Sequence, residues 1–211
     1  MIKFFIFLFC MNLSTNSFAD NKVNYFKDIP IKNSNGFYQS VIEIESGEND
    51  KWEVIKKSGK IKVEKIDQEI PRKINYLSYP FNYGIIPQTI LTVEDGGDGD
   101  PLDVVVLGEK IKRGSVIEIN ILGSINFIDS GDNDLKIIAI KKNNSIFKNI
   151  QDFDDLNNNY AGVIEIIKLW FLNYKGKNKV YYDQILNKDE TEIIIKKSHK
   201  RFMFYINNLQ Q

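Results

Sequence analysis

The sequence is almost devoid of the two residue types that most often perform nucleophilic and zinc chemistry. Of its 211 residues, one is a cysteine, Cys10, and one is a histidine, His199. A zinc site of histidine and cysteine, a serine–histidine–aspartate triad and a cysteine–histidine pair would each lack an essential member. Catalysis by this chain has to rely on carboxylates, lysines, tyrosines and hard metal ions. His199 lies in a lysine-rich C-terminal segment, and we expect it at the surface.

An excess of either charge is also absent. Lysine and arginine together number 28, as do aspartate and glutamate. Nucleic-acid binders usually show a basic surplus, so we expect no nucleic-acid partner. The length suits a single domain with a sizeable core. We place this domain at residues 37–211, after a polar and irregular N-terminal arm over residues 20–36.

The first 19 residues have the three regions of a secretory signal peptide. Lys3 precedes an apolar run over residues 4–13, and polar residues follow up to Ala19. We predict cleavage after Ala19 and export to the periplasm or the medium. The apolar run is shorter than the roughly 18 residues that a membrane span needs, so no membrane association is expected after cleavage. Cleavage would also remove Cys10 and with it any disulfide.

Residue patterns predict many short strands followed by two helices. Apolar and polar residues alternate over residues 39–45, and again over 51–55 and 60–66, which are separated by Ser58 and Gly59 as in a hairpin. Further strands are predicted at residues 102–107, 115–127 and 135–140. Helical spacing marks residues 160–174 and 189–206, the second with Asp189 or Thr191 as its cap. This order is typical of a mainly β fold, a small closed barrel with helices packed outside.

The stretch TVEDGGDGDPLDVVVLG, residues 92–108, combines three carboxylates with a buried strand. Asp98, Asp100 and Asp103 lie within six positions, Gly99 permits a sharp turn, and Pro101 leads into the apolar run. Carboxylates crowded at the start of a buried strand are unfavourable unless cations lie among them. Ligands that offer only oxygen favour Mg²⁺ or Mn²⁺. An EF-hand is excluded, because Asp103 replaces the required glycine and the flanks are strands.

A second acidic segment, DSGDND over residues 129–134, separates two predicted strands. A barrel could bring it to the same rim as the first acidic stretch. Taken alone, its aspartates would more often form a solvated loop. Residues 74–89, INYLSYPFNYGIIPQT, contain two prolines, which disfavour a helix, and three tyrosines, which are unusual in a free loop. We therefore predict an ordered segment that forms one wall of a structured region.

These motifs together resemble soluble family I inorganic pyrophosphatase over nearly the whole mature chain. The resemblance rests on DGDPLD followed by VVVLG, on the preceding PFNYGIIPQT, and on the later RGSV and NYKGK in this order. The family implies a five-stranded barrel of the OB type. It also implies hydrolysis of pyrophosphate to two phosphates with several Mg²⁺ ions, Mn²⁺ being a possible substitute, by attack of a metal-bridged hydroxide. Such proteins form homo-oligomers, and pyrophosphate and phosphate are the implied ligands.

The resemblance also implies roles for individual residues. Asp100 matches the general base, and Glu43 matches an outer acidic residue that holds further metal through water. Glu53 matches the glutamate of the family's paired lysine and glutamate and is also implied in the metal site. The implied metal ligands of the two acidic segments are Asp98, Asp103, Asp129 and Asp134. The residues implied to surround or activate the phosphates are Lys51, Arg72, Tyr79, Tyr83, Lys136, Tyr174 and Lys175.

Several alternatives stay open. The family's phosphate-contacting arginine aligns with Lys65, but we favour Arg72 because a guanidinium can bind phosphate oxygens bidentately. Lys177 and Lys179 both fit a further lysine beyond NYKGK. The competing functions are a non-catalytic binding module on an OB-type barrel, and a hydrolase of another phosphoanhydride.

Overall fold

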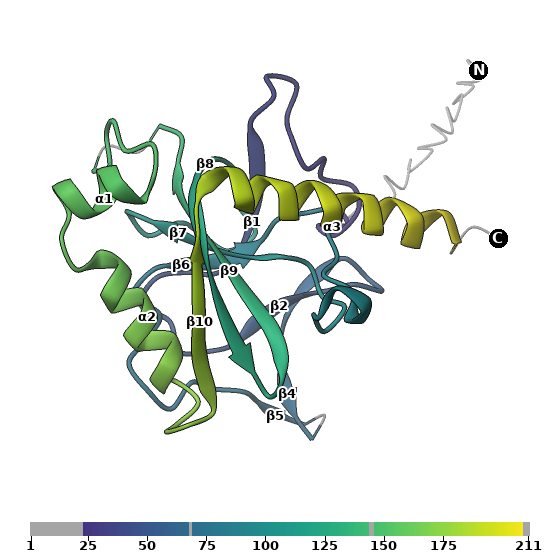
Figure 1. Ribbon diagram of the computed structural model, residues 1–211. Helices are drawn as coiled ribbons and strands as arrows, with labels where there is room; N and C mark the ends of the chain where they lie inside the picture. The colour runs from purple at the N-terminus through teal and green to yellow at the C-terminus, as the bar shows by residue number, and fades with distance from the viewer. Residues whose placement is uncertain (1–22, 68, 144–145, 209–211) are drawn as a thin grey trace, which may run out of the picture.

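A computed structural model describes residues 23–67, 69–143 and 146–208 of the chain. The predicted signal peptide lies outside the described residues. Within them the fold is mainly β with three α-helices (Figure 1). The strands are β1 (Tyr38–Ile44), β2 (Trp52–Ile55), β3 (Lys60–Val63), β4 (Lys65–Ile66), β5 (Ile70–Pro71), β6 (Asn82–Ile85), β7 (Asp103–Leu107), β8 (Val116–Asp129), β9 (Asp132–Lys141) and β10 (Val180–Leu186). The helices are the short 3₁₀ helix η1 (Val93–Asp95), α1 (Phe153–Asn159), α2 (Val163–Asn173) and α3 (Lys188–Asn208).

Five strands pair in a closed ring. The main sheet runs in the order β1-β6-β7-β9-β8-β10, and β1 also pairs with β8, so β10 is an addition outside the ring. The pairs are antiparallel except β7 with β9, which run parallel. The 14 residues of β8 let it pair with three different strands. The strands predicted at residues 39–45, 102–107, 115–127 and 135–140 are confirmed as members of this ring.

The hydrophobic run of β7 is buried on both faces. Val104 and Val106 belong to a core that includes Ile195 of α3, whereas Val105 and Leu107 belong to a core that includes Phe171 of α2. A strand covered on both faces is expected to be a continuous apolar run, as the sequence is here. The start of β7, with Asp103, therefore has a fixed position in the fold.

The second acidic segment differs from its prediction. Residues 129–134 are not a loop, since β8 continues to Asp129 and β9 begins at Asp132. Only Ser130 and Gly131 form the turn, and both have positive φ, of 57° and 102°. This is the geometry that two-residue hairpins favour, because it matches the twist of the strands. The acidic side chains here thus extend from paired strands.

Other sequence predictions met mixed outcomes. The hairpin of β2 and β3 and the helices α2 and α3 are confirmed, while β5, β6, α1 and β10 were missed. The predicted cap of α3 is wrong. Asn187 caps it, since its Oδ1 accepts from the Glu190 amide at 3.0 Å while a Glu190 carboxylate oxygen accepts from the Asn187 amide at 2.8 Å. His199 is half-buried instead of exposed, with Nδ1 2.7 Å from the Gln88 carbonyl.

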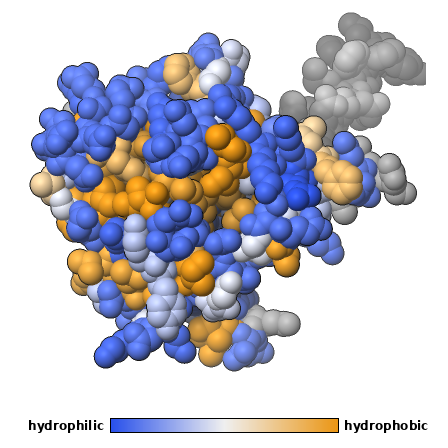
Figure 2. Space-filling model, in the orientation of Figure 1, coloured by the Kyte–Doolittle hydropathy of each residue, from blue (hydrophilic) through white to orange (hydrophobic). Residues whose placement is uncertain are grey.

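The described part of the N-terminal arm packs against the domain. Phe26 is buried and its ring meets Phe202 of α3 edge-on, with the ring centroids 5.1 Å apart. Among the described residues, no helix has the length and apolar character that crossing a membrane requires. The face in Figure 2 shows apolar side chains among hydrophilic ones. On α2 and β10, Ile166, Leu169 and Tyr181 are more than half exposed.

Two residues of the NYG motif, Asn82 and Gly84, have structural roles. The buried side-chain amide of Asn82 accepts a hydrogen bond from the Ile111 backbone amide at 2.8 Å and donates one to the Glu109 carbonyl at 2.8 Å. These two bonds fix the turn after β7. Gly84 lies opposite Ile42 in the antiparallel pairing of β6 with β1, and a Cβ there would come within 1.9 Å of the Val41 carbonyl oxygen. Only glycine fits this backbone approach.

We expect Gly84→Ala to lower the free energy of unfolding by about 3 kcal/mol or more, at the upper end of overpacking costs, because backbone atoms must move. Urea unfolding of the purified protein measures the change. Gly36→Ala is the control, since Gly36 has a left-handed φ of 82° and open space around it, and its cost should be about 1 kcal/mol. Equal costs for the two variants would contradict the argument.

Candidate active site

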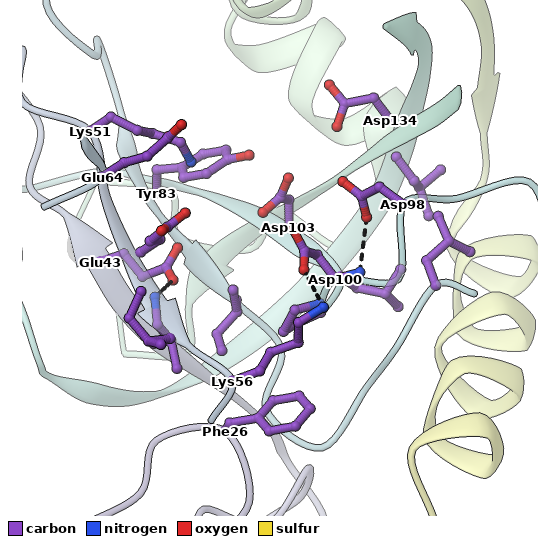
Figure 3. A pocket seen from close by; sticks show the side chains of 18 of the residues that line it. Phe26, Glu43, Lys51, Lys56, Glu64, Tyr83, Asp98, Asp100, Asp103 and Asp134 are labelled. Atoms are coloured by element: carbon purple, nitrogen blue, oxygen red, sulfur yellow. Dashed lines mark hydrogen bonds and ion pairs between the residues drawn. The ribbon is translucent and has the colours of Figure 1, made fainter. Parts of the chain in front are cut away.

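A cavity of about 1070 Å³ opens at one side of the ring and collects every predicted site residue (Figure 3). These residues come from β1, β2, β6, β7, β8 and β9, from the loops between them, and from the turn after α2. Distant parts of the chain therefore meet in one place. The predicted residues that line the cavity are Glu43, Lys51, Glu53, Arg72, Tyr79, Tyr83, Asp98, Asp100, Asp103, Asp129, Asp134, Lys136, Tyr174 and Lys175.

The acidic corner before β7 is held by its own backbone. Gly99 has a φ of 83°, and the Asp100 amide donates to Asp98 Oδ1 at 2.9 Å. Just beyond the corner, Thr89 Oγ1 accepts from the Leu102 amide at 3.0 Å. The IPQT motif thus supplies a side chain that fixes the entry to β7. Figure 3 shows Asp98, Asp100 and Asp103 close together along the cavity.

The two acidic segments lie side by side. The Asn133 amide donates to the Gly96 carbonyl at 2.7 Å, which joins β9 to the loop that leads to Asp98. Gly96 has a left-handed φ of 82°, which favours glycine at this position. The parallel pairing of β7 and β9 places Asp103 opposite Lys136. The predicted meeting of the two acidic segments is therefore confirmed.

Lys136 is the electrostatic centre of the cavity. Its buried Nζ lies 2.6 Å from Asp103 Oδ2, 2.5 Å from Asp134 Oδ1 and 2.8 Å from the Tyr83 hydroxyl. Burial lowers the pKa of Lys136, but the two carboxylates outweigh it and raise this pKa well above its ordinary value. For Asp103, burial alone would raise the pKa, but the positive charge of Lys136 outweighs burial and lowers this pKa below its ordinary value. Lys136 and Asp103 are therefore both charged at neutral pH.

The carboxylates without such a close cation behave differently. Burial, followed by the neighbouring aspartates, raises the pKa of Asp98. Burial also raises the pKa of Glu43 to about 8, although Lys51 opposes this and the Val54 amide donates to Glu43 Oε1 at 2.5 Å. The pKa of Glu53 is raised by burial as well. Acids with raised pKa values are those that a bound cation would stabilise most.

Cationic and phenolic groups also line the cavity. Lys51 is in the field of Tyr79, Asp103 and Glu43, which together outweigh burial and raise its pKa. Burial raises the pKa of Tyr83 well above its ordinary value and also raises that of Tyr79. Each hydroxyl therefore keeps its proton at neutral pH and can donate a hydrogen bond.

The turn after α2 adds Tyr174 and Lys175. Burial raises the pKa of Tyr174, whose ring stacks on Trp170 with centroids 4.8 Å apart. Lys175 forms an ion pair with Asp129 at the end of β8. Arg72, which pairs with Glu64 at 2.7 Å, also lines the cavity.

The structure distinguishes between the alternative basic residues. Lys65 is exposed on β4 and does not line the cavity, so Arg72 is the basic residue that reaches it. Lys177 lies outside the cavity, whereas Lys179 lines a smaller adjoining one that shares Arg72 and Tyr174 with the first.

Three residues of the cavity were missed from the sequence. Lys56 Nζ lies 2.6 Å from Asp100 Oδ1 and 2.8 Å from the Gly99 carbonyl, and Figure 3 shows this contact. Glu64 holds Arg72, and Asn133 joins the acidic segments. Lys56 and Glu64 belong to no motif, and Asn133 is an uncharged member of the second acidic segment. The β2–β3 alternation does not distinguish Lys56 from a surface lysine.

The donor set suits hard divalent cations. Across the described ranges, no three aspartate, glutamate, histidine or cysteine side chains are gathered tightly enough to enclose a metal ion. Lys136 instead provides the positive charge between Asp103 and Asp134. The oxygen-only ligands and the raised pKa of Asp98 nevertheless fit Mg²⁺ or Mn²⁺, which commonly share their coordination with phosphate oxygens.

Comparison with known proteins identifies the class of this fold and site. The family model for inorganic pyrophosphatase matches residues 40–203. The chain therefore belongs to the inorganic pyrophosphatase family.

Among its relatives, the inorganic pyrophosphatase of Drosophila melanogaster is 30% identical over 204 residues, covering 85% of this chain and 60% of that protein. The chain thus spans less than two thirds of the length of this relative. The crystal structure of the type I inorganic pyrophosphatase of P. falciparum has a TM-score of 0.80 at 29% identity, covering 88% of this chain and 65% of that one. An N-terminally truncated vacuolar soluble pyrophosphatase of Trypanosoma cruzi, solved in complex with PPi, has a TM-score of 0.75 at 26% identity, covering 87% and 72%.

We expect Lys136→Met to lower the free energy of unfolding by about 3–5 kcal/mol without divalent cations, because two carboxylates lose their buried counter-charge. Mg²⁺ should restore part of this loss by binding the folded state. Urea unfolding with EDTA and with Mg²⁺ measures both effects. The control is Lys73→Met, whose exposed ion pair with Asp50 spans 3.4 Å and should contribute less than about 1 kcal/mol. Similar losses in the two variants would contradict the central position of Lys136.

Proposed function

We propose that this chain hydrolyses inorganic pyrophosphate to two phosphates. The observation that carries the proposal is the cavity itself, which gathers aspartates, lysines, an arginine and tyrosine hydroxyls in one place. Such a site can hold a small polyanion by its phosphate oxygens while cations neutralise the carboxylates. The PPi complex of the T. cruzi relative supports the same ligand.

Mg²⁺ is the metal that we infer, with Mn²⁺ as a possible substitute. Asp98, Asp103 and Asp134 would hold the tighter ions, and Asp129 would add a ligand when substrate is present. Glu43 and Glu53 would act at a greater distance. Bound divalent cations would lower the pKa of the attacking water and neutralise the phosphate oxygens. Lys136 would then share Asp103 and Asp134 with the metal ions.

The remaining residues divide into a base and a set of donors. Asp100 is the inferred general base, because its side chain is 58% exposed in the cavity and accessible to a water. Lys51, Arg72 and Lys175 would bind phosphate oxygens. Tyr83 would donate to the leaving phosphate, as would Tyr79 and Tyr174, since their raised pKa values keep the hydroxyls protonated. No covalent intermediate is required.

Two finer structural features also belong to the proposal. We infer that the ring of five paired strands is an OB-type barrel, as the pairing of β1 with both β6 and β8 supports. We also infer a homo-oligomer, for which the exposed Ile166, Leu169 and Tyr181 offer an apolar contact surface.

The activity is tested by phosphate release from pyrophosphate with and without Mg²⁺. We expect Asp103→Ala to abolish most of the activity, and Asp100→Asn to lower kcat by about 10²- to 10⁴-fold, because a neutral amide cannot accept the proton. Asp132→Asn is the matched control, since Asp132 is exposed on the same acidic hairpin and does not line the cavity. A wild type that turns over pyrophosphate no faster than Asp103→Ala would overturn the proposed activity.

Export remains a proposal drawn from the first 19 residues. A reporter enzyme fused after Ala19, and active only outside the cytoplasm, should be active in cells of the native type. The control is the same fusion without residues 1–19, which should stay inactive. A full fusion that stays in the cytoplasm would refute export without affecting the proposed activity.

A further inference from the structure

The loop that leads to Asp98 carries a carboxylate that does not face the cavity. Asp95 ends η1 and its side chain is only 9% exposed, yet it is not among the residues that line the cavity. A carboxylate so far removed from water requires charged or hydrogen-bonding partners. These partners lie on α3, which Figure 3 shows beside this loop.

Two basic residues of α3 hold Asp95. Arg201 Nε lies 3.0 Å from Oδ2 and its Nη2 lies 3.2 Å from Oδ1, which is a bidentate arrangement. Lys197 Nζ lies 2.7 Å from Oδ1, and Arg201 Nη1 also reaches Glu94 Oε2 at 3.2 Å. Hydrogen bonds from Arg201 and then Lys197 lower the pKa of Asp95 to about 2, so it stays charged near neutral pH.

The helix α3 is fixed by contacts that do not involve Asp95. Ile195, Ser198 and Phe202 are buried, and the Ile90 amide donates to the Ser198 carbonyl at 3.2 Å. His199 contacts the Gln88 carbonyl as described above. The position of α3 therefore does not depend on Asp95, and the ion pairs of Asp95 hold the loop against the helix.

The other side of the same loop contacts the second acidic segment. The Asn133 amide binds the Gly96 carbonyl, one residue after Asp95 and two before Asp98. The loop thus lies between α3 and β9. A shift of η1 away from α3 would change the distance between Asp98 and Asp134, because Asp134 follows Asn133 directly in β9.

We propose that Asp95, Arg201 and Lys197 form a positioning clamp that holds Asp98 in register with Asp103 and Asp134 for metal binding. These three residues act through the loop and do not touch substrate. The inference rests on the proposed function for its metal, whereas the contacts of the clamp itself involve only side chains of η1 and α3. Partners that orient metal ligands commonly affect metal affinity by about 10- to 100-fold.

The variants Asp95→Asn and Arg201→Ala test the clamp. We expect calorimetric titration with Mg²⁺ alone to give a dissociation constant about tenfold higher than that of the wild type. Amide exchange without metal should be faster at Gly97 and Gly99, whose amides bond within the loop at 3.0 and 2.8 Å. The double variant should lose less than the sum of the two single losses, since both variants disrupt the contact between Arg201 and Asp95.

The control and a conservative variant make the outcome specific. Lys196→Ala removes an exposed ion pair with Glu192 of 3.5 Å on the same helix, and should change neither measurement. Arg201→Lys, which keeps the charge without the bidentate contact, should give intermediate Mg²⁺ affinity. Since Arg201 is 38% exposed on its side chain, its truncation is compatible with folding.

Wild-type Mg²⁺ affinity or wild-type amide exchange in both Asp95→Asn and Arg201→Ala would overturn the clamp. So would an equal effect of Lys196→Ala. Because neither measurement uses pyrophosphate, a wild type that fails to hydrolyse pyrophosphate would refute the proposed activity while the exchange data still decide the clamp.

Discussion

The contact between the buried ammonium of Lys136 and the carboxylates of Asp103 and Asp134 is the interaction on which the site depends. Its three partners come from β7 and β9, and the parallel register that pairs these strands brings them together. Charges that are buried in this way are stable only as a set. The pairing of strands in the ring keeps these three charged groups in contact.

The family signature contains two kinds of residue, which the sequence alone does not separate. Asp98, Asp100 and Asp103 line the cavity. Asn82 and Thr89, by contrast, satisfy backbone groups that would otherwise be buried without partners. The family signature is dense because residues that line the cavity and residues that hydrogen-bond its backbone occupy neighbouring positions in the chain.

The sequence predicted most of the ring and a set of site residues that all line the cavity, because alternation and a dense motif are local signals. It failed where the signal is not local. β10 is an outer strand whose middle residues are mostly exposed, so its burial pattern lacks clear alternation. α1 is only seven residues long, too short to show a helical period. The acidic hairpin was mistaken for a loop, since aspartates favour turns in general but here extend along paired strands.

The parallel pairing of β7 and β9 has a consequence for the way the chain folds. Asp103 and Lys136 lie 33 positions apart, and they meet only after β8 has doubled back between them. Loop closure of this kind slows folding, since its entropic cost precedes the contacts that compensate it. Until then the aspartates around Asp100 repel one another without a counter-charge. The rate at which this ring closes should therefore depend on the ions in solution, which screen that repulsion.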